Sequence, residues 1–567
     1  MTGSAARARH ASINRHDKGR ALSKTTAGLA VALLAVLTAT EAGAAGLPRL
    51  QQNGRAIQLM VDGAPYIALN GELHNSSPSS PAYMAPIWDR LAKNGVRTVI
   101  GAASWELVEP EEGRYDFTAV DDQIRQAHVH GMRLMLIWFG AYKNAESSYA
   151  PSWVRRDLTR FPRAQRDPAA ESKGIAAFLN GPVLSVFGDP LVRSDARAFA
   201  ALMRHVRQVD RDQTVIMVQV ENEVGMVGDS RDRSPLANAA WDKPVPPALM
   251  AYLAAHRADL RPGLLEAWGR QGFRRAGTWA EVFGTDSAAD EIFMAWGFGR
   301  YVETVAKAGA AEYPLPMYTN AWLGPQPGAS NPGDYPSGGP VARMMDVWKA
   351  AAPTLALLAP DIYVDDFGGT LGDFHRSNNP VFIPEARFDA GNLFVALGQY
   401  DAISFSPFGI EDGAEDSEVF QAYRVLNEMT GLVADAQRDG RVRGFKVAAG
   451  ARQLEKLGGY DLAISQQRGT LGAFGPGTGS AEQAKASGYG LVINSGPDEF
   501  LIVGRAVSIA FTAPDAKVEI DSAQQGVFKD GRWTPGRTLN GDERFFLFPG
   551  DSLRIVRVKL LRRSPNG

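Results

Sequence analysis

Two patterns of apolar and polar positions alternate between about residues 50 and 437. Short apolar runs rich in β-branched residues are separated by segments in which apolar residues recur with helical spacing. The predicted strands are YIALNGELH (66–74), VRTVIGAAS (96–104), RLMLIWFGAY (133–142), TVIMVQVENE (214–223), LPMYTNAWL (315–323), LLAPDIYVD (357–365), PVFIPEAR (380–387) and AISFSPFGI (402–410). Helices are expected between them, for example over 194–210, where Ser194-Asp195 predicts the N-cap.

Strands that alternate with helices predict a parallel sheet, because each parallel return needs a crossover connection. The number of runs favours a (β/α)8 TIM barrel, and a doubly wound open sheet is the alternative. Polar and aromatic residues favour the barrel, since they gather at the C-terminal ends of strands, where barrels place their sites. They are Glu72 and His74, Trp105 and Glu106, Tyr142 and Glu146, Asn222 and Glu223, Asn320 and Trp322, Asp361 and Tyr363, Glu385, and Phe405 and Phe408.

The pattern of apolar and polar positions changes after the helical segment 417–437. Short strands with Gly, Pro, Asn and Asp turns follow, which is typical of an all-β, sandwich-like domain. We therefore expect a catalytic barrel over residues 45–437 and a C-terminal β-domain over 438–567.

The first 44 residues read as a signal peptide. Basic residues between positions 7 and 24 precede the apolar run AGLAVALLAVLTA, and Ala42-Gly43-Ala44 follows as a cleavage signal. An uncleaved membrane anchor is the alternative, but the run is shorter than the roughly 18 residues that a spanning helix needs. We expect cleavage near Ala44 or Ala45, and a periplasmic or secreted protein with no membrane attachment after cleavage.

The composition of the chain excludes several classes of function. The 567 residues carry a formal net charge of -2 at pH 7, which offers no basic field for nucleic acid. The chain has no cysteine, which excludes disulfides, thiol nucleophiles and cysteine metal sites. The histidines show no metal-binding spacing, so we expect neither a catalytic metal nor a cofactor.

Carboxylates at the mouth of a barrel indicate acid and base chemistry. Glu223 and Glu385 each end a predicted strand, and two such glutamates suit the acid/base and nucleophile of glycoside hydrolysis. The alternative for Glu385 is a structural ion pair with Arg387. Glu221 competes with Glu223, because residues two apart on a regular strand face the same way, although a bulge at the rim can re-aim them.

The strand-end motifs resemble glycoside hydrolase family 35, the retaining β-galactosidases. The resembling stretches are GELHNSS (71–77), SWELVEPEEGRYDF (104–117), GAYKNAES (140–147), QVENEVG (219–225) and PEARFD (384–389). The resemblance implies double displacement with Glu223 as the acid/base and Glu385 as the nucleophile. It also implies a β-linked galactoside as substrate, with plant cell-wall side chains as one source.

Further site residues follow from the resemblance. Asn222 would bond the sugar 2-hydroxyl, and Glu146 would bind galactose hydroxyls. Tyr363 would hydrogen-bond the nucleophile. Trp105 is expected in the pocket floor or, equally, in the core, and His74 is expected to line the pocket.

Two positions depart from the family pattern. Ala102 stands where family members carry a sugar-binding tyrosine, and Val224 replaces the tyrosine of the usual ENEYG. A β-glucosidase or an endo-β-glycanase of the same clan therefore remains an alternative. An inactive carbohydrate-binding barrel is the alternative from a different functional class.

Overall fold

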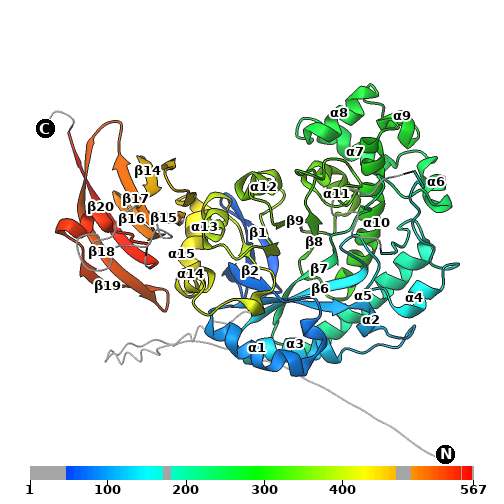
Figure 1. Ribbon diagram of the computed structural model, residues 1–567, viewed down its shortest axis with the longest axis horizontal. Helices are drawn as coiled ribbons and strands as arrows, with labels where there is room; N and C mark the ends of the chain where they lie inside the picture. The colour runs from blue at the N-terminus through cyan, green and yellow to red at the C-terminus, as the bar shows by residue number, and fades with distance from the viewer. Residues whose placement is uncertain (1–45, 170–180, 468–486, 551, 565–567) are drawn as a thin grey trace, which may run out of the picture. The chain divides into compact units, whose positions relative to one another are not determined.

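The computed structural model describes residues 46–169, 181–467, 487–550 and 552–564 (Figure 1). Ala45–Gly567 form one compact unit. The predicted signal peptide, residues 1–44, lies outside the described residues. In the part of the chain that the structure describes, none of the helices is both long enough and apolar enough to cross a bilayer.

Eight parallel strands form the barrel, in the order β10-β9-β8-β7-β6-β5-β4-β11. A parallel bridge between Ala386 and Pro407 joins the two ends of this order and closes the sheet. The closure excludes the doubly wound open sheet and confirms the predicted barrel. The strands are β4 (Ala68–Glu72), β5 (Thr98–Ser104), β6 (Arg133–Lys143), β7 (Val215–Asn222), β8 (Met317–Trp322), β9 (Leu357–Ile362), β10 (Glu385–Ala386) and β11 (Ser404–Phe405).

Side chains fill the bore of the barrel. Ile137 and Phe139 of β6, Tyr318 of β8 and Phe382 before β10 belong to one buried apolar cluster. Leu59 joins the same cluster from a small antiparallel sheet made of β1 (Arg49–Asn53), β2 (Ala56–Val61) and β3 (Ala64–Tyr66). A bore packed in this way leaves only the C-terminal mouth of the strands for a site.

Helices surround the barrel strands and bury their apolar faces in a second, larger core (Figure 1). They are α1 (Pro81–Lys93), α2 (Trp105–Val108), α3 (Thr118–Val129), α4 (Ser152–Arg156), α5 (Asp189–Val209), α6 (Pro235–Trp241), α7 (Pro247–Ala255), α8 (Pro262–Arg270), α9 (Trp279–Phe283), α10 (Ser287–Glu312), α11 (Met345–Ala351), α12 (Phe367–Phe374), α13 (Ala390–Gln399), α14 (Glu418–Asn427) and α15 (Thr430–Asp439).

One helix start differs from the sequence prediction. Helix α5 begins at Asp189 after the N-cap Gly188, so Ser194 and Asp195 lie inside the helix. Asp195 is fully buried and accepts a 2.7 Å hydrogen bond from the indole of Trp138 on β6. The Ser194-Asp195 pair therefore does not cap the helix. Asp195 instead connects α5 to the barrel strand β6, a contact that the local sequence does not reveal.

The C-terminal region consists of two antiparallel sheets around a shared core, which confirms the predicted all-β architecture. The larger sheet has the order β12-β15-β16-β20-β18-β19 and the smaller one β13-β14-β17. The strands are β12 (Val442–Val447), β13 (Arg452–Leu457), β14 (Tyr460–Gln466), β15 (Gly488–Gly496), β16 (Glu499–Arg505), β17 (Val507–Thr512), β18 (Lys517–Lys529), β19 (Arg532–Thr538) and β20 (Arg554–Arg563).

Helix α13 of the barrel packs closely against strand β12. A Cβ atom on Gly444 would lie 1.9 Å from the carbonyl oxygen of Phe394, so only glycine permits this approach. Lys446 of β12 also donates a 2.6 Å hydrogen bond to Asp389, the N-cap of α13. These contacts buttress the helix that directly follows Glu385 on β10.

Candidate active site

The end of strand β7 decides which of its glutamates reaches the barrel mouth. Glu221 and Glu223 both have positive φ, at 61° and 44°. L-residues rarely adopt this left-handed conformation, and it breaks the alternation of side chains along a strand. Asn222 and Glu223 reach the mouth, whereas Glu221 faces helix α5 behind the sheet.

Glu221 belongs to a buried carboxyl pair outside the bore. Its oxygens accept hydrogen bonds from the amides of Ala141 and Tyr142 at 3.2 and 2.7 Å, and its side chain bonds with Asp195. Burial and the neighbouring Asp195 raise the pKa of Glu221 well above its ordinary range, so the pair holds a proton. Glu221 therefore anchors the ends of β6 and β7 to α5.

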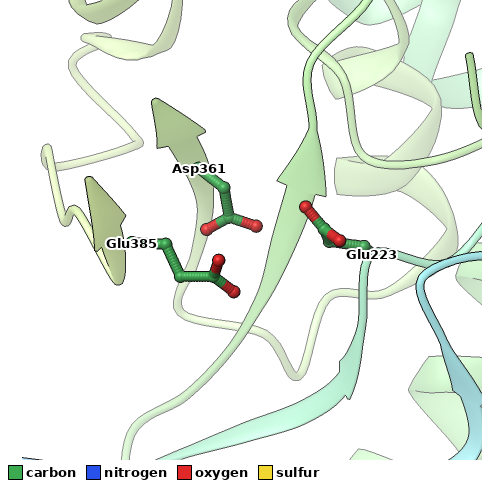
Figure 2. Close-up of side chains that lie close together, drawn as sticks. All are labelled: Glu223, Asp361 and Glu385. Atoms are coloured by element: carbon green, nitrogen blue, oxygen red, sulfur yellow. The ribbon is translucent and has the colours of Figure 1, made fainter. Parts of the chain in front are cut away.

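Three carboxyl groups converge in the mouth of the barrel: Glu223 after β7, Asp361 on β9 and Glu385 on β10. Figure 2 shows the three side chains pointing toward one another from their separate strands. One oxygen of each lies within 4.8 Å of an oxygen of the other two, and all three residues are buried. Since retaining glycosidases need carboxyl groups roughly 5–5.5 Å apart, Glu223 and Glu385 have a suitable separation.

Two neighbours orient the carboxylate of Glu385. The Tyr363 hydroxyl donates to Oε2 at 2.8 Å, and the Asn222 side-chain amide donates to Oε1 at 3.5 Å. Arg387 pairs with Asp365 at 2.9 Å, so the alternative ion pair with Glu385 does not form. The structure thus brings Tyr363 and Asn222 to the carboxylate of Glu385, which remains free to react.

Lys143, the last residue of β6, is the buried cation of the site. Its ammonium group donates a 3.0 Å hydrogen bond to Asn222 Oδ1 and lies 5.1 Å from the centre of the Phe139 ring. Through Lys143 the amide of Asn222 is fixed with its nitrogen directed at Glu385.

Burial and the nearby Glu385 raise the pKa of Glu223 from its ordinary 4.5 to about 7, while Lys143 and a hydrogen bond with Asp361 oppose the rise. A carboxyl group with this pKa is able to donate a proton near neutral pH and to take it back. The backbone nitrogen of Glu223 donates to Asn320 Oδ1 at 3.0 Å, which holds the strained residue in place.

A cavity of about 520 Å³ opens above these groups, large enough for a sugar unit and part of its aglycone. Its lining residues are Asn75, Lys143, Asn144, Glu223, Trp322, Leu323, Gln326, Asp361, Tyr363, Val364, Glu385 and Phe408. A side cavity of about 170 Å³ shares Asn75 with it and is lined in part by Ala102. The small side chain at position 102 thus leaves space beside the main cavity.

Four residues expected to bind substrate do not line the cavity, and one of them, Asn222, is fully buried. Glu146 lies in the turn after β6, where its carboxylate accepts a 2.7 Å hydrogen bond from the Gly181 amide. Trp105 is fully buried in the core and donates to Glu109 at 2.8 Å. His74 bonds Asp412 at 2.6 Å and supports Phe408, which does line the cavity, through an edge contact of 5.2 Å.

The sequence pattern assigns no role to two charged residues of the site, Asp361 and Lys143. Asp361 is among the polar residues at the strand ends, two positions before Tyr363, but nothing local gives it a role. Lys143 follows an apolar strand directly, and a buried lysine at that place is a signal that the sequence does carry.

The three carboxyl groups are close enough to share a cation by distance alone. Proximity of carboxyl groups by itself does not make a metal site, and we assign no metal to them.

Comparison with known proteins points to β-galactosidases. The family model Glyco_hydro_42, described as beta-galactosidase, matches residues 82–281, which include Asn222 and Glu223 but not Glu385. A domain of unknown function, DUF5597, matches residues 419–549. The resemblance to glycoside hydrolase family 35 is not confirmed, since the matching model belongs to a different β-galactosidase family.

The individual relatives and solved structures that resemble parts of this chain include beta-galactosidases and a beta-amylase. A beta-galactosidase from Xanthomonas manihotis is 27% identical over 237 residues, which are 39% of this chain and 35% of that protein. This chain therefore matches about a third of the length of that relative. The beta-galactosidase of the psychrophilic Marinomonas ef1 aligns over 66% of this chain and 62% of its own, with 12% identity and a TM-score of 0.43. The catalytic domain of a beta-amylase from Paenibacillus polymyxa aligns over 62% and 95%, with 10% identity and a TM-score of 0.41.

Proposed function

We propose that this protein is a retaining β-galactosidase in which Glu223 is the acid/base and Glu385 the nucleophile. The observation that carries the proposal is the pair of buried carboxyl groups at a spacing suited to retention, one with a pKa of about 7 and the other accepting a hydrogen bond from Tyr363. The β-galactosidase model that matches residues 82–281 supports galactose as the sugar.

The proposed reaction has two displacements. In the first, Glu385 attacks the anomeric carbon while Glu223 donates its proton to the glycosidic oxygen, and the aglycone leaves. In the second, water attacks the glycosyl-enzyme, and Glu223 takes a proton from that water. Tyr363 and Asn222 orient Glu385 for the attack. In this proposal Asn222, which is fully buried beside Glu385, also bonds the 2-hydroxyl of the sugar.

The substrate in this proposal is a terminal β-linked galactoside of an oligosaccharide or polysaccharide, with plant cell-wall side chains as one source. Ala102 and Val224 leave the hydroxyl-binding groups of the family 35 pattern absent at two positions. We infer that galactose is selected by other residues of the cavity.

Stereochemistry tests the mechanism. NMR of the first-formed sugar from an aryl β-galactoside should show the β anomer, and a 2-fluoro galactosyl fluoride should label Glu385 covalently, as peptide mass spectrometry would show. First-formed α-galactose would overturn the assignment, because it would mean inversion through a bound water. Faster turnover of aryl glucosides or cellobiosides than of galactosides would instead overturn the choice of sugar while leaving the mechanism intact.

We further propose that the chain is exported and cleaved near Ala44 or Ala45. The support is the basic, apolar and small-residue order of positions 7–44. Intact-mass measurement on protein from a native host should give a mature N-terminus at one of these residues, and a full-length mass would contradict cleavage.

A further inference from the structure

Asp361 occupies a central position between the two proposed catalytic groups. It pairs in register with Glu385 on one neighbouring strand and with Trp322 on the other. Figure 2 shows its carboxyl group directed into the space between Glu223 and Glu385. Its side chain lines the cavity, and the residue is only 2% exposed. A carboxyl group in this place interacts electrostatically with both Glu223 and Glu385.

One side chain ties Asp361 to Glu223. Asn320 of β8 donates to Asp361 Oδ2 at 2.6 Å and accepts from the Glu223 backbone nitrogen at 3.0 Å. Asn320 therefore fixes the position of one Asp361 oxygen relative to the backbone of the proposed acid/base. The other oxygen, Oδ1, is buried and has no hydrogen-bond donor facing it among the described residues.

A proton on Asp361 explains why no donor faces Oδ1, because a protonated carboxyl oxygen is itself a donor. One carboxyl oxygen each of Asp361, Glu223 and Glu385 lies within 4.8 Å of the other two, and all three residues are buried. Buried carboxyl groups this close together cannot all be ionised, so Asp361 is protonated when its neighbours are charged. Lys143 favours the charged form of Glu223, whereas the principal charged neighbours of Asp361 are the carboxylates of Glu385, Glu223 and Glu72. When Glu223 is ionised, the proton shared by the pair therefore belongs on Asp361.

We propose that Asp361 stays protonated through the catalytic cycle and acts as a positioning residue that donates a hydrogen bond to the Glu223 carboxylate. The inference rests on the proposed function. When Glu223 gives its proton to the glycosidic oxygen, the new carboxylate accepts the hydrogen bond from Asp361, and the later proton from water returns to Glu223. The proton on Asp361 does not leave, so the proton balance of hydrolysis is unchanged.

The surroundings of the pair support this assignment. The titratable and charged groups that face it are Glu72 of β4, Lys143 of β6, Tyr318 of β8, Tyr363 after β9 and Glu385 of β10. Lys143 is the one cation among these groups. Burial, followed by Glu385 and Glu223, raises the pKa of Asp361 well above its ordinary range. Burial similarly raises the pKa of Glu72, and the groups that shift the pKa of Asp361 are carboxyl groups rather than cations.

Two substitutions distinguish a neutral donor from a charged group. Asp361→Asn keeps a neutral donor toward Glu223 and an acceptor for Asn320, so the basic limb of kcat/KM against pH should stay within about 0.3 pH units of wild type. Asp361→Leu removes the donor, so Glu223 should ionise less readily and the basic limb should move up by about one pH unit. Asp365→Asn is the matched control, because it removes a carboxylate that is 98% exposed on the following loop.

A basic limb that moves to lower pH in Asp361→Asn would show that Asp361 is charged in the native enzyme, which would overturn the proposal. A basic limb that stays in place in a folded Asp361→Leu would overturn it as well, since a merely structural role predicts no change. If Asp361→Leu fails to fold, the Asp361→Asn result still decides between a neutral and a charged Asp361.

The titration of Glu223 can also be followed without any turnover. Protein labelled with 13C at the glutamate side-chain carboxyl carbon gives a Glu223 signal that is identified by its loss in Glu223→Gln. Its titration midpoint should change as the kinetic limb does in each Asp361 variant. A wild-type protein without galactosidase activity would defeat the proposed function, while this titration would still test the hydrogen bond from Asp361.

Discussion

At the scale of single residues, the acid/base assignment predicts a specific pattern of lost and retained activity. Glu223→Gln should lose most hydrolysis of substrates with poor leaving groups, because those need protonation of the glycosidic oxygen. Activated aryl galactosides should still glycosylate Glu385, and added azide should restore turnover. The measurement is kcat/KM on a series of aryl galactosides with and without azide. An equal loss across the whole series would contradict the role of an acid.

Asn222 offers a second prediction at this scale. Its amide lies 3.5 Å from Glu385 and is held by Lys143, and a bond to the 2-hydroxyl strengthens in the transition state. Asn222→Ala should therefore cost about 3 kcal/mol, which is a loss of roughly a hundredfold in kcat as well as in kcat/KM. Steady-state kinetics check this outcome, and a rise in KM alone would mean that the residue only binds the ground state.

At the scale of elements, the ends of β6 and β7 depend on the carboxyl pair of Glu221 and Asp195. Glu221→Ala leaves the amide of Tyr142 unpaired in a fully buried place and removes the carboxyl partner of Asp195, to which Ala141 still donates at 3.1 Å, so it should destabilise the protein by about 3 kcal/mol. Thermal unfolding measures this loss.

Glu221→Gln is the matched control for both glutamates, because the amide accepts from Tyr142 and donates to Asp195 as a protonated glutamate does. It should keep near wild-type stability and hydrolysis. If Glu221→Gln shows the azide-rescued pattern and Glu223→Gln does not, then the orientation of the two side chains at the end of β7 is wrong.

At the scale of the whole molecule, buried carboxyl groups make stability depend on pH in an uncommon direction. Burial raises the pKa of Glu72, Glu221, Glu223 and Asp361, so the folded chain holds protons that the unfolded chain has released. Their contribution is fully present below the unfolded pKa values, 4.5 for the glutamates and 3.8 for Asp361, and is lost as pH rises through the folded values. For Glu223, a change from 4.5 to about 7 corresponds to roughly 3 kcal/mol.

The Tm should therefore fall between pH 5 and pH 8, and Glu223→Gln should lose part of that slope. Carboxyl groups with lowered pKa, such as Asp439 at about 2, titrate below this range and do not offset the fall. Calorimetry at constant ionic strength measures the slope. A Tm that rises with pH over this interval in the wild type would contradict the protonated state of the cluster.

The hydrophobic pattern by itself determined the architecture of this protein. Eight apolar runs alternating with helical segments predicted the strands β4 to β11, because a repeat of a few residues is a local property that the chain keeps when it folds. The change of pattern after residue 437 likewise predicted the antiparallel sheets. The positions of polar residues at strand ends also followed from sequence, since a parallel barrel brings all those ends to one face.

Contacts between distant parts of the chain set which polar side chains meet. The left-handed backbone at Glu221 and Glu223 depends on Asn320 and on the amides of β6, which lie far away in the chain. The structure alone placed Trp105 in the core and Asp361 beside Glu223. Side-chain direction at an irregular strand end, and the proton that a buried carboxyl group keeps, are set by neighbours from other strands, and no local pattern encodes them.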